Sequence, residues 1–231
     1  MNRNKLGLAR WSFAVADPHT LKLARISQSF QLATAIVLAP ILFLICQRLP
    51  VRFGWENGPV ETTQAIMLAV AGILSLCMAY VRRGHVQRYF WLAALLVWLI
   101  LLGRELSWGA VFISPSAIDP QSGPLLSSRY LSYKPLVPYV GGAVALLAAA
   151  LCGWAQPRGM LRHAMIRKGL LPWGSLLGAM MYALIVVYAE NGQKTVAGIP
   201  QNAQVVEEVF ETVTYYFLIR FQWAGFSRWL K

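Results

Sequence analysis

The stretch YFWLAALLVWLILLGRELSWGAVFI, residues Tyr89–Ile113, decides the fold class. It begins with an unbroken apolar run, and the whole stretch exceeds the roughly 20 residues that an α-helix needs to cross a bilayer. Only Arg104 and Glu105 are charged within it. Because a bilayer offers no water to backbone amides, a spanning segment of this kind is expected to be a transmembrane α-helix.

The rest of the chain has the same character. Of the 231 residues, 57% are hydrophobic and only 13% are charged, whereas a soluble domain carries about 25% charged residues. Further apolar runs of spanning length lie at Phe30–Leu49, Val60–Val81, Leu136–Ala155, Leu171–Ala189 and Val205–Ile219. We therefore expect an all-α polytopic membrane protein. Residues 1–29 would form a cytoplasmic basic segment, and residues 30–231 a bundle of about six transmembrane helices.

The basic residues predict the topology. With the N-terminus in the cytoplasm, most of the 21 Lys and Arg fall on the cytoplasmic side, so the positive-inside rule places both termini there. The exceptions are Arg48, Arg52, Arg104, Arg129, Lys134 and Lys194. The formal charge of +12 lies mostly in short loops between apolar runs. The expected partner is therefore a bilayer with an anionic inner leaflet, and not nucleic acid.

The acidic residues are divided the opposite way. Of the nine Asp and Glu, all except Asp17 fall on the outer side, whereas His19, His85 and His163 fall on the inner side. A polar site would thus open outward and consist of carboxylates, which argues against a metal centre of mixed His and carboxylate ligands. No metal and no cofactor are predicted. The sequence also lacks a Walker A loop, an H-E-x-x-H motif and a G-x-S-x-G motif, which argues against ATP-driven pumping and against serine or zinc hydrolysis.

Arg104 and Glu105 are the strongest candidates for a functional site. If the third helix continues to Ile113, Glu105 lies about eight residues, or about 12 Å, from its end. An ionisable group at that depth costs at least ~2.5 kcal/mol and normally faces a partner or a water-filled cavity. Adjacent helix positions point about 100° apart, so each of the two should meet a group on another helix. Trp108 shares the face of Glu105 and is a further candidate.

More carboxylates open the last helix and the second. Glu207, Glu208, Glu211 and Tyr215 lie on one broad face of the last helix, because their spacing is three to four residues. Glu61, with Gln64 one turn on, opens the second helix. The alternative is structural: glutamates in a first helical turn are favoured by the helix dipole and often mark the membrane boundary. Trp108 and Tyr215 would then be packing or interfacial residues.

Two segments resemble a known group. Glu56–Glu61 and Arg104–Gly109 are similar to segments of uncharacterised polytopic bacterial membrane proteins, in which an acidic Glu-Asp-Gly segment opens one helix and a Glu-Glu-Ile-Ser-Trp-Gly-Gln segment lies in the next. The present sequence departs from that pattern at Asn57, Arg104 and Ala110. The resemblance implies a bacterial inner-membrane location and brings no activity with it.

Three functions remain open at this point. The carboxylates could take a proton, a metal cation or an amine-bearing solute in a small transporter or binding protein. The chain could instead be a scaffold or accessory subunit with a protein partner or a second copy of itself. It could also be a lipid-directed enzyme in which Arg104 holds a phosphate. The loop Ser114–Pro135 is either a lid over the site or a connector. All three hypotheses depend on whether the carboxylates of the second, third and last helices converge on Arg104.

Overall fold

The computed structural model describes residues 18–85, 88–113, 115, 117–119, 123–125, 131–155, 172–195 and 202–229. Its α-helices are α1 (Pro18–Cys46), α2 (Pro59–Val81), α3 (Arg88–Glu105), α4 (Val137–Ala155), α6 (Trp173–Thr195) and α7 (Ala203–Trp229). Short 3₁₀ helices cover Val51–Gly54 (η1), Ser107–Phe112 (η2) and Lys134–Leu136 (η4). The expected all-α class is confirmed, with one addition. Strands β1 (Ala117–Asp119) and β2 (Gly123–Leu125) form an antiparallel hairpin within the expected loop.

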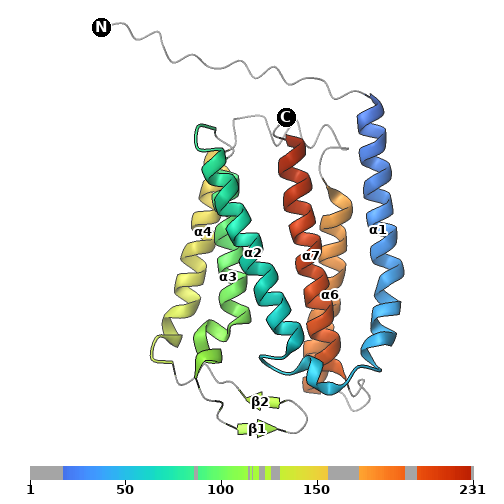
Figure 1. Ribbon diagram of the computed structural model, residues 1–231, viewed down its shortest axis with the longest axis vertical. Coiled ribbons are helices and arrows are strands. Elements are labelled where there is room, and N and C mark those ends of the chain that lie inside the picture. The colour runs from blue at the N-terminus through green and yellow to red at the C-terminus, as the bar shows by residue number, and fades with distance from the viewer. Residues whose placement is uncertain are drawn as a thin grey trace, which may run out of the picture.

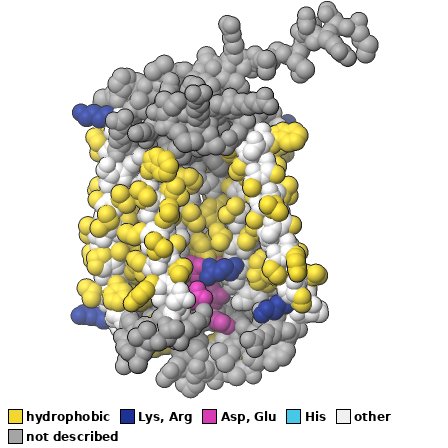
Figure 2. Space-filling model, turned by 180° about the vertical axis from the view of Figure 1, so that it is seen from behind, with side chains coloured by type: hydrophobic (Ala, Val, Ile, Leu, Met, Phe, Trp, Pro, Cys, Tyr) yellow, Lys and Arg dark blue, Asp and Glu magenta, His cyan; other side chains and the backbone are white. Residues whose placement is uncertain are grey.

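Four segments of the structure are long and apolar enough to cross a membrane. They are Ile26–Cys46, Val51–Val81, Lys134–Trp154 and Trp173–Asn191. The remaining two long helices, α3 and α7, contain the charged residues of interest, such as Arg104 and Glu211. Apolar side chains cover the middle of the molecule, with Lys and Arg towards both ends of this belt (Figure 2). The arrangement is that of a membrane protein.

The helices form two groups that run side by side (Figure 1). One group consists of α1, α6 and α7, and the other of α2, α3 and α4. Within the first group the backbones pack closely at Gly174, where a Cβ would lie 2.3 Å from the carbonyl oxygen of Gln28. Helix α1 begins, and α7 ends, at the end of the bundle opposite the hairpin (Figure 1).

Helix α3 ends earlier than the apolar pattern predicts. The expectation that the third helix continues to Ile113 is wrong, because α3 ends at Glu105. Ser107, Trp108 and Gly109 then adopt left-handed backbone angles, with φ of 45°, 54° and 98°. This turn folds the Trp108 ring back over α3, where a Cβ on Gly103 would lie 2.9 Å from its Cζ3 atom. Close contact between the ring and a residue without a side chain stabilises the break.

Helix α1 also differs from the prediction. It begins at Pro18 rather than near Phe30, so the last part of the basic amino-terminal segment is helical. Residues 1–17, the remainder of that segment, lie outside the described residues.

Candidate functional site

The last turn of α3 meets the second and third turns of α7 in an ion pair. Arg104 donates a hydrogen bond from Nη1 to Oε1 of Glu211, and its Nη2 lies 3.4 Å from Oε2 of the same carboxylate. The Arg104 side chain is 50% exposed, whereas that of Glu211 is 9% exposed. Arg104 therefore meets a group on another helix, as expected of a charged residue in an apolar helix.

Tyr215 joins a second carboxylate to this pair. Its hydroxyl oxygen lies 2.6 Å from Oε1 of Glu105 and 2.9 Å from Oε1 of Glu211. Nη1 of Arg104 donates to the same hydroxyl over 3.2 Å. Glu105 is almost fully buried and lies 3.7 Å from Nη1 of Arg104. The Tyr215 hydroxyl is thus within hydrogen-bond distance of both carboxylates.

Glu208 completes a group of three carboxylates. Glu105, Glu208 and Glu211 each offer an oxygen, and these oxygens lie within 4.8 Å of one another. We call these three residues the carboxylate cluster. Oε2 of Glu208 is buried and has no hydrogen-bond partner among the described residues. The cluster therefore contains an acceptor oxygen that the described protein atoms leave unsatisfied.

Gln64 on α2 lies against the same turn of α7. Its side chain is fully buried, and Nε2 donates to the Glu208 carbonyl oxygen over 2.7 Å and to Oγ1 of Thr212 over 3.0 Å. Its Oε1 atom has no partner within the described part of the chain. Gln64 was predicted only as a neighbour of Glu61, and Thr212 was not predicted. The sequence signal for Gln64 was an amide side chain one turn after Glu61, a glutamate at the start of an apolar helix.

Glu61 reaches the site from another direction. It is 9% exposed and accepts a hydrogen bond from the backbone N–H of Asn57. Glu61 and Glu105 both line a cavity of about 80 Å³, whose other lining residues are Asn57, Thr62, Ala65, Leu106 and Val111. A cavity of that volume with carboxylates in its wall is large enough to hold water. Glu61 is also close enough to interact electrostatically with Glu105 and Glu211.

Two predicted candidates lie apart from the cluster. Trp108 packs on Gly103, and its carbonyl oxygen accepts a hydrogen bond of 2.7 Å from the Tyr133 hydroxyl. Glu207 is not among the carboxylates whose oxygens gather within 4.8 Å. The structure thus brings together Arg104, Glu105, Glu208, Glu211 and Tyr215, with Glu61 at an adjoining cavity.

The charge of the site is unbalanced. Glu61 and the carboxylate cluster would bear four negative charges when ionised, and Arg104 is the single cation that contacts them among the residues described. Two like charges about 5 Å apart repel by about 3 kcal/mol at an effective dielectric constant of about 20. Repulsion of that size is relieved when the site takes up a proton or another cation.

A second polar contact lies further along α7, towards its carboxyl end. The indole N–H of Trp98 donates to Oε1 of Gln222 over 2.6 Å, and Nε2 of Gln222 lies 2.9 Å from Oγ of Ser75. Trp98 of this contact and Tyr215 of the carboxylate site belong to one buried cluster with Leu68 and Ala71. Neither Gln222 nor Ser75 was predicted, because the expected site rested on charged residues and not on uncharged amides and hydroxyls.

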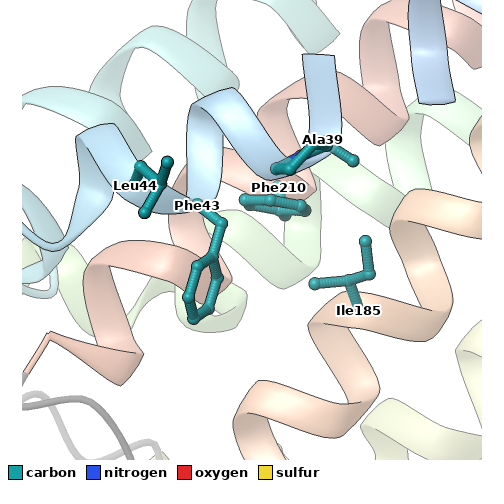
Figure 3. Close-up of a pocket in the computed structure, with 6 residues that line it drawn as sticks. Ala39, Phe43, Leu44, Ile185 and Phe210 are labelled. Atoms are coloured by element: carbon teal, nitrogen blue, oxygen red, sulfur yellow. The ribbon is translucent and has the colours of Figure 1, made fainter. Parts of the chain in front are cut away.

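The larger hollow on the surface has a different chemistry. It has a volume of about 430 Å³ and lies between α1, α6 and α7 (Figure 3). Its lining residues are Ala39, Pro40, Phe43, Leu44, Ile185 and Phe210. None of these is polar, so this hollow offers only apolar contact.

The chain matches no protein-family model, no curated protein and no solved structure.

Proposed function

We propose that this chain is a multi-pass inner-membrane protein that binds, and as a transporter moves, a cationic group at the carboxylate cluster. The observation that carries the proposal is the excess of carboxylates over cations at a largely buried site. Ionisable groups inside a membrane bundle normally belong to a ligand or proton pathway. A proton, a metal cation and an ammonium group all have the charge that the site needs.

The ligand atoms favour a hard cation or an ammonium group. The cluster offers carboxylate oxygens only, and oxygen ligands suit hard cations and N–H donors rather than soft metals. Helix α3 also ends at Glu105, so the negative end of its dipole lies at the site. Interrupted helices with their ends at the bound ion are a recurring feature of membrane transporters. The unpartnered oxygens of Gln64 and Glu208 would complete the coordination.

The topology that goes with this function has six spans and both termini in the cytoplasm. The common position of the start of α1 and the end of α7 supports it (Figure 1). The hairpin end of the bundle, where the carboxylate cluster lies, would then face outward. The cavity beside Glu61 would lie on that outward side of the site.

Ligand-dependent stability tests the proposal. The full chain in detergent is melted with increasing manganese chloride or ethanolamine hydrochloride as the probe. A ligand at 100 times its Kd stabilises the folded state by about 2.7 kcal/mol, so a rise in Tm is expected for at least one probe. Glu105→Gln and Glu208→Gln should abolish that rise.

Glu190→Gln is the matched control, because Glu190 is an exposed glutamate on α6 outside the cluster. This variant should retain the wild-type response. If neither probe shifts the Tm of the wild type, and acidification changes wild type and Glu208→Gln alike, the site binds no cation.

A scaffold role is the second candidate, and one observation favours it. The Arg104–Glu211 ion pair joins the two helix groups, which is a structural task. A stoichiometric partner that purifies with the wild type and is lost from Glu211→Gln would support this role. The cation-binding role instead requires a ligand response in the isolated chain.

A further inference from the structure

The guanidinium of Arg104 has an unoccupied edge. A guanidinium has five N–H donors in a planar fork. Nη1 and Nη2 face Glu211, and Nη1 also faces Tyr215. The edge formed by Nε–H and the remaining Nη2–H has no acceptor among the described residues. Half of the side chain is exposed, so a ligand at the surface can reach Arg104.

Charged side chains also reach the apolar surface of the bundle. Figure 2 shows apolar side chains on both sides of a hollow, and acidic and basic side chains reach the surface at its lower end. Behind Arg104, the carboxylates of Glu105 and Glu211 are only 5% and 9% exposed. A ligand at this surface can thus contact the half-exposed guanidinium, and the less exposed carboxylates lie beside it.

If α7 enters the bilayer at its first residue, the site lies at about the depth of a lipid head group. Glu208 lies five residues after the start of α7, which corresponds to about 7.5 Å along the helix. The head-group layer of a bilayer is about 5–7 Å thick on each side of the hydrocarbon core. A lipid beside the bundle therefore needs only a small displacement to bring its head group level with the carboxylate cluster.

We propose that the cationic group bound at the carboxylate cluster is the ammonium of a zwitterionic phospholipid, whose phosphate binds the free edge of Arg104. This proposal rests on the proposed function and names its ligand class. Arginine binds phosphate through two parallel N–H donors, which the free edge of Arg104 provides. A primary ammonium has three donors, enough to reach the oxygens of Glu208, Glu211 and Glu105 together. The lipid tails stay among the apolar faces of the belt.

A choline head group would fit this arrangement poorly. Its quaternary ammonium has the same charge but no N–H, so Oε2 of Glu208 would remain without a donor. A glycerol head group has the phosphate but no cation, so its negative charge would be added to a site that already has an excess of carboxylates. The site should therefore prefer phosphatidylethanolamine to both.

Lipid retention tests this preference. The full chain is reconstituted in nanodiscs with equal parts of phosphatidylethanolamine, phosphatidylcholine and phosphatidylglycerol, extracted in mild detergent and weighed by native mass spectrometry. We expect at least a fivefold enrichment of phosphatidylethanolamine on the wild type. A parallel arm with soluble phosphoethanolamine distinguishes a lipid from a free head group: competition by the soluble compound at millimolar concentration would show that the head group alone suffices.

Four variants show whether the lipid preference depends on the proposed site: two change the site and two are controls. Arg104→Lys keeps the charge but loses the planar edge, and Glu208→Gln removes an acceptor that is in no ion pair; both should lose the enrichment. Arg48→Gln and Glu190→Gln change exposed charges elsewhere and should keep it. Equal retention of the three lipids, enrichment of phosphatidylglycerol, or an unchanged preference in Glu208→Gln would overturn the lipid proposal. A Tm response to manganese or ethanolamine would persist in that case if the cation-binding function is correct.

Discussion

Loss of either partner of the Arg104–Glu211 ion pair should destabilise the protein, but by unequal amounts. A double-mutant cycle can test this expectation. Arg104→Gln leaves Glu105, Glu208 and Glu211 together without a cation. Glu211→Gln removes one negative charge and leaves Arg104 beside Glu105, 3.7 Å away. The arginine variant should therefore be the less stable of the two, although both break the same pair.

The magnitude follows from the position of the pair. Two opposite charges about 4 Å apart attract by about 4 kcal/mol at an effective dielectric constant of about 20, and by about 1 kcal/mol in water. Because Arg104 is half-exposed, the coupling energy should lie between these limits, at about 2 kcal/mol. Loss of Arg104 should also expose the repulsion within the cluster, so Arg104→Gln should be less stable than Glu211→Gln by about 2 kcal/mol. For a chain of this size, that corresponds to a difference of about 4–8 °C in Tm.

The assay is thermal unfolding of the two single variants, the double variant and the wild type in the same detergent. The double variant should be more stable than additivity predicts, by the coupling energy. Lys134→Gln, which changes an exposed lysine outside the cluster, is the control. Equal losses in both single variants, together with strict additivity in the double variant, would refute the idea that Arg104 compensates several carboxylates at once.

Three further predictions concern neighbouring contacts. Glu208→Gln should raise the Tm in ligand-free detergent, and more at pH 9 than at pH 5, because it removes a negative charge that has no partner; a Tm below that of wild type at both pH values would contradict this. Trp98→Phe should lower stability by about 1 kcal/mol, since it leaves Oε1 of Gln222 without its donor, and urea or thermal unfolding in micelles would measure the loss. Gly174→Ala should destabilise the α1–α6 contact by about 1–3 kcal/mol, because its Cβ would lie 2.3 Å from the backbone oxygen of Gln28; an unchanged Tm would show that the two helices can shift apart freely.

The convergence of the site could be predicted from charge alone. Arg104 and Glu105 are charged groups in an apolar run, and such groups need partners on other helices. Glu211 and Tyr215, spaced by four residues on α7, supply those partners. The face of the helix that bears the site thus follows from elementary rules.

The rest of the site depends on features with a weaker sequence signal. The break after Glu105 was not predicted, because Leu106, Trp108 and the apolar residues after them continue the same hydrophobic run. The contacts at the break are the Trp108 ring against Gly103 and, from further along the chain, the Tyr133 hydroxyl on the Trp108 carbonyl oxygen. Gln64 was not identified as a member of the site either, because an uncharged amide in a helix gives no sign of whether it faces a neighbour or lipid.

If the carboxylate cluster binds a cation, as we propose, the division of the helices into two groups has a consequence for ligand exchange. Glu105 comes from α3 in one group, and Glu208 and Glu211 come from α7 in the other. A cation held between them is attracted to both groups at once, so its binding free energy opposes any movement that parts them. Departure of the ligand would reverse the balance, since carboxylates left facing one another push the groups apart. Binding of a cation and the separation of the two helix groups would thereby be linked through the charges of the carboxylate cluster.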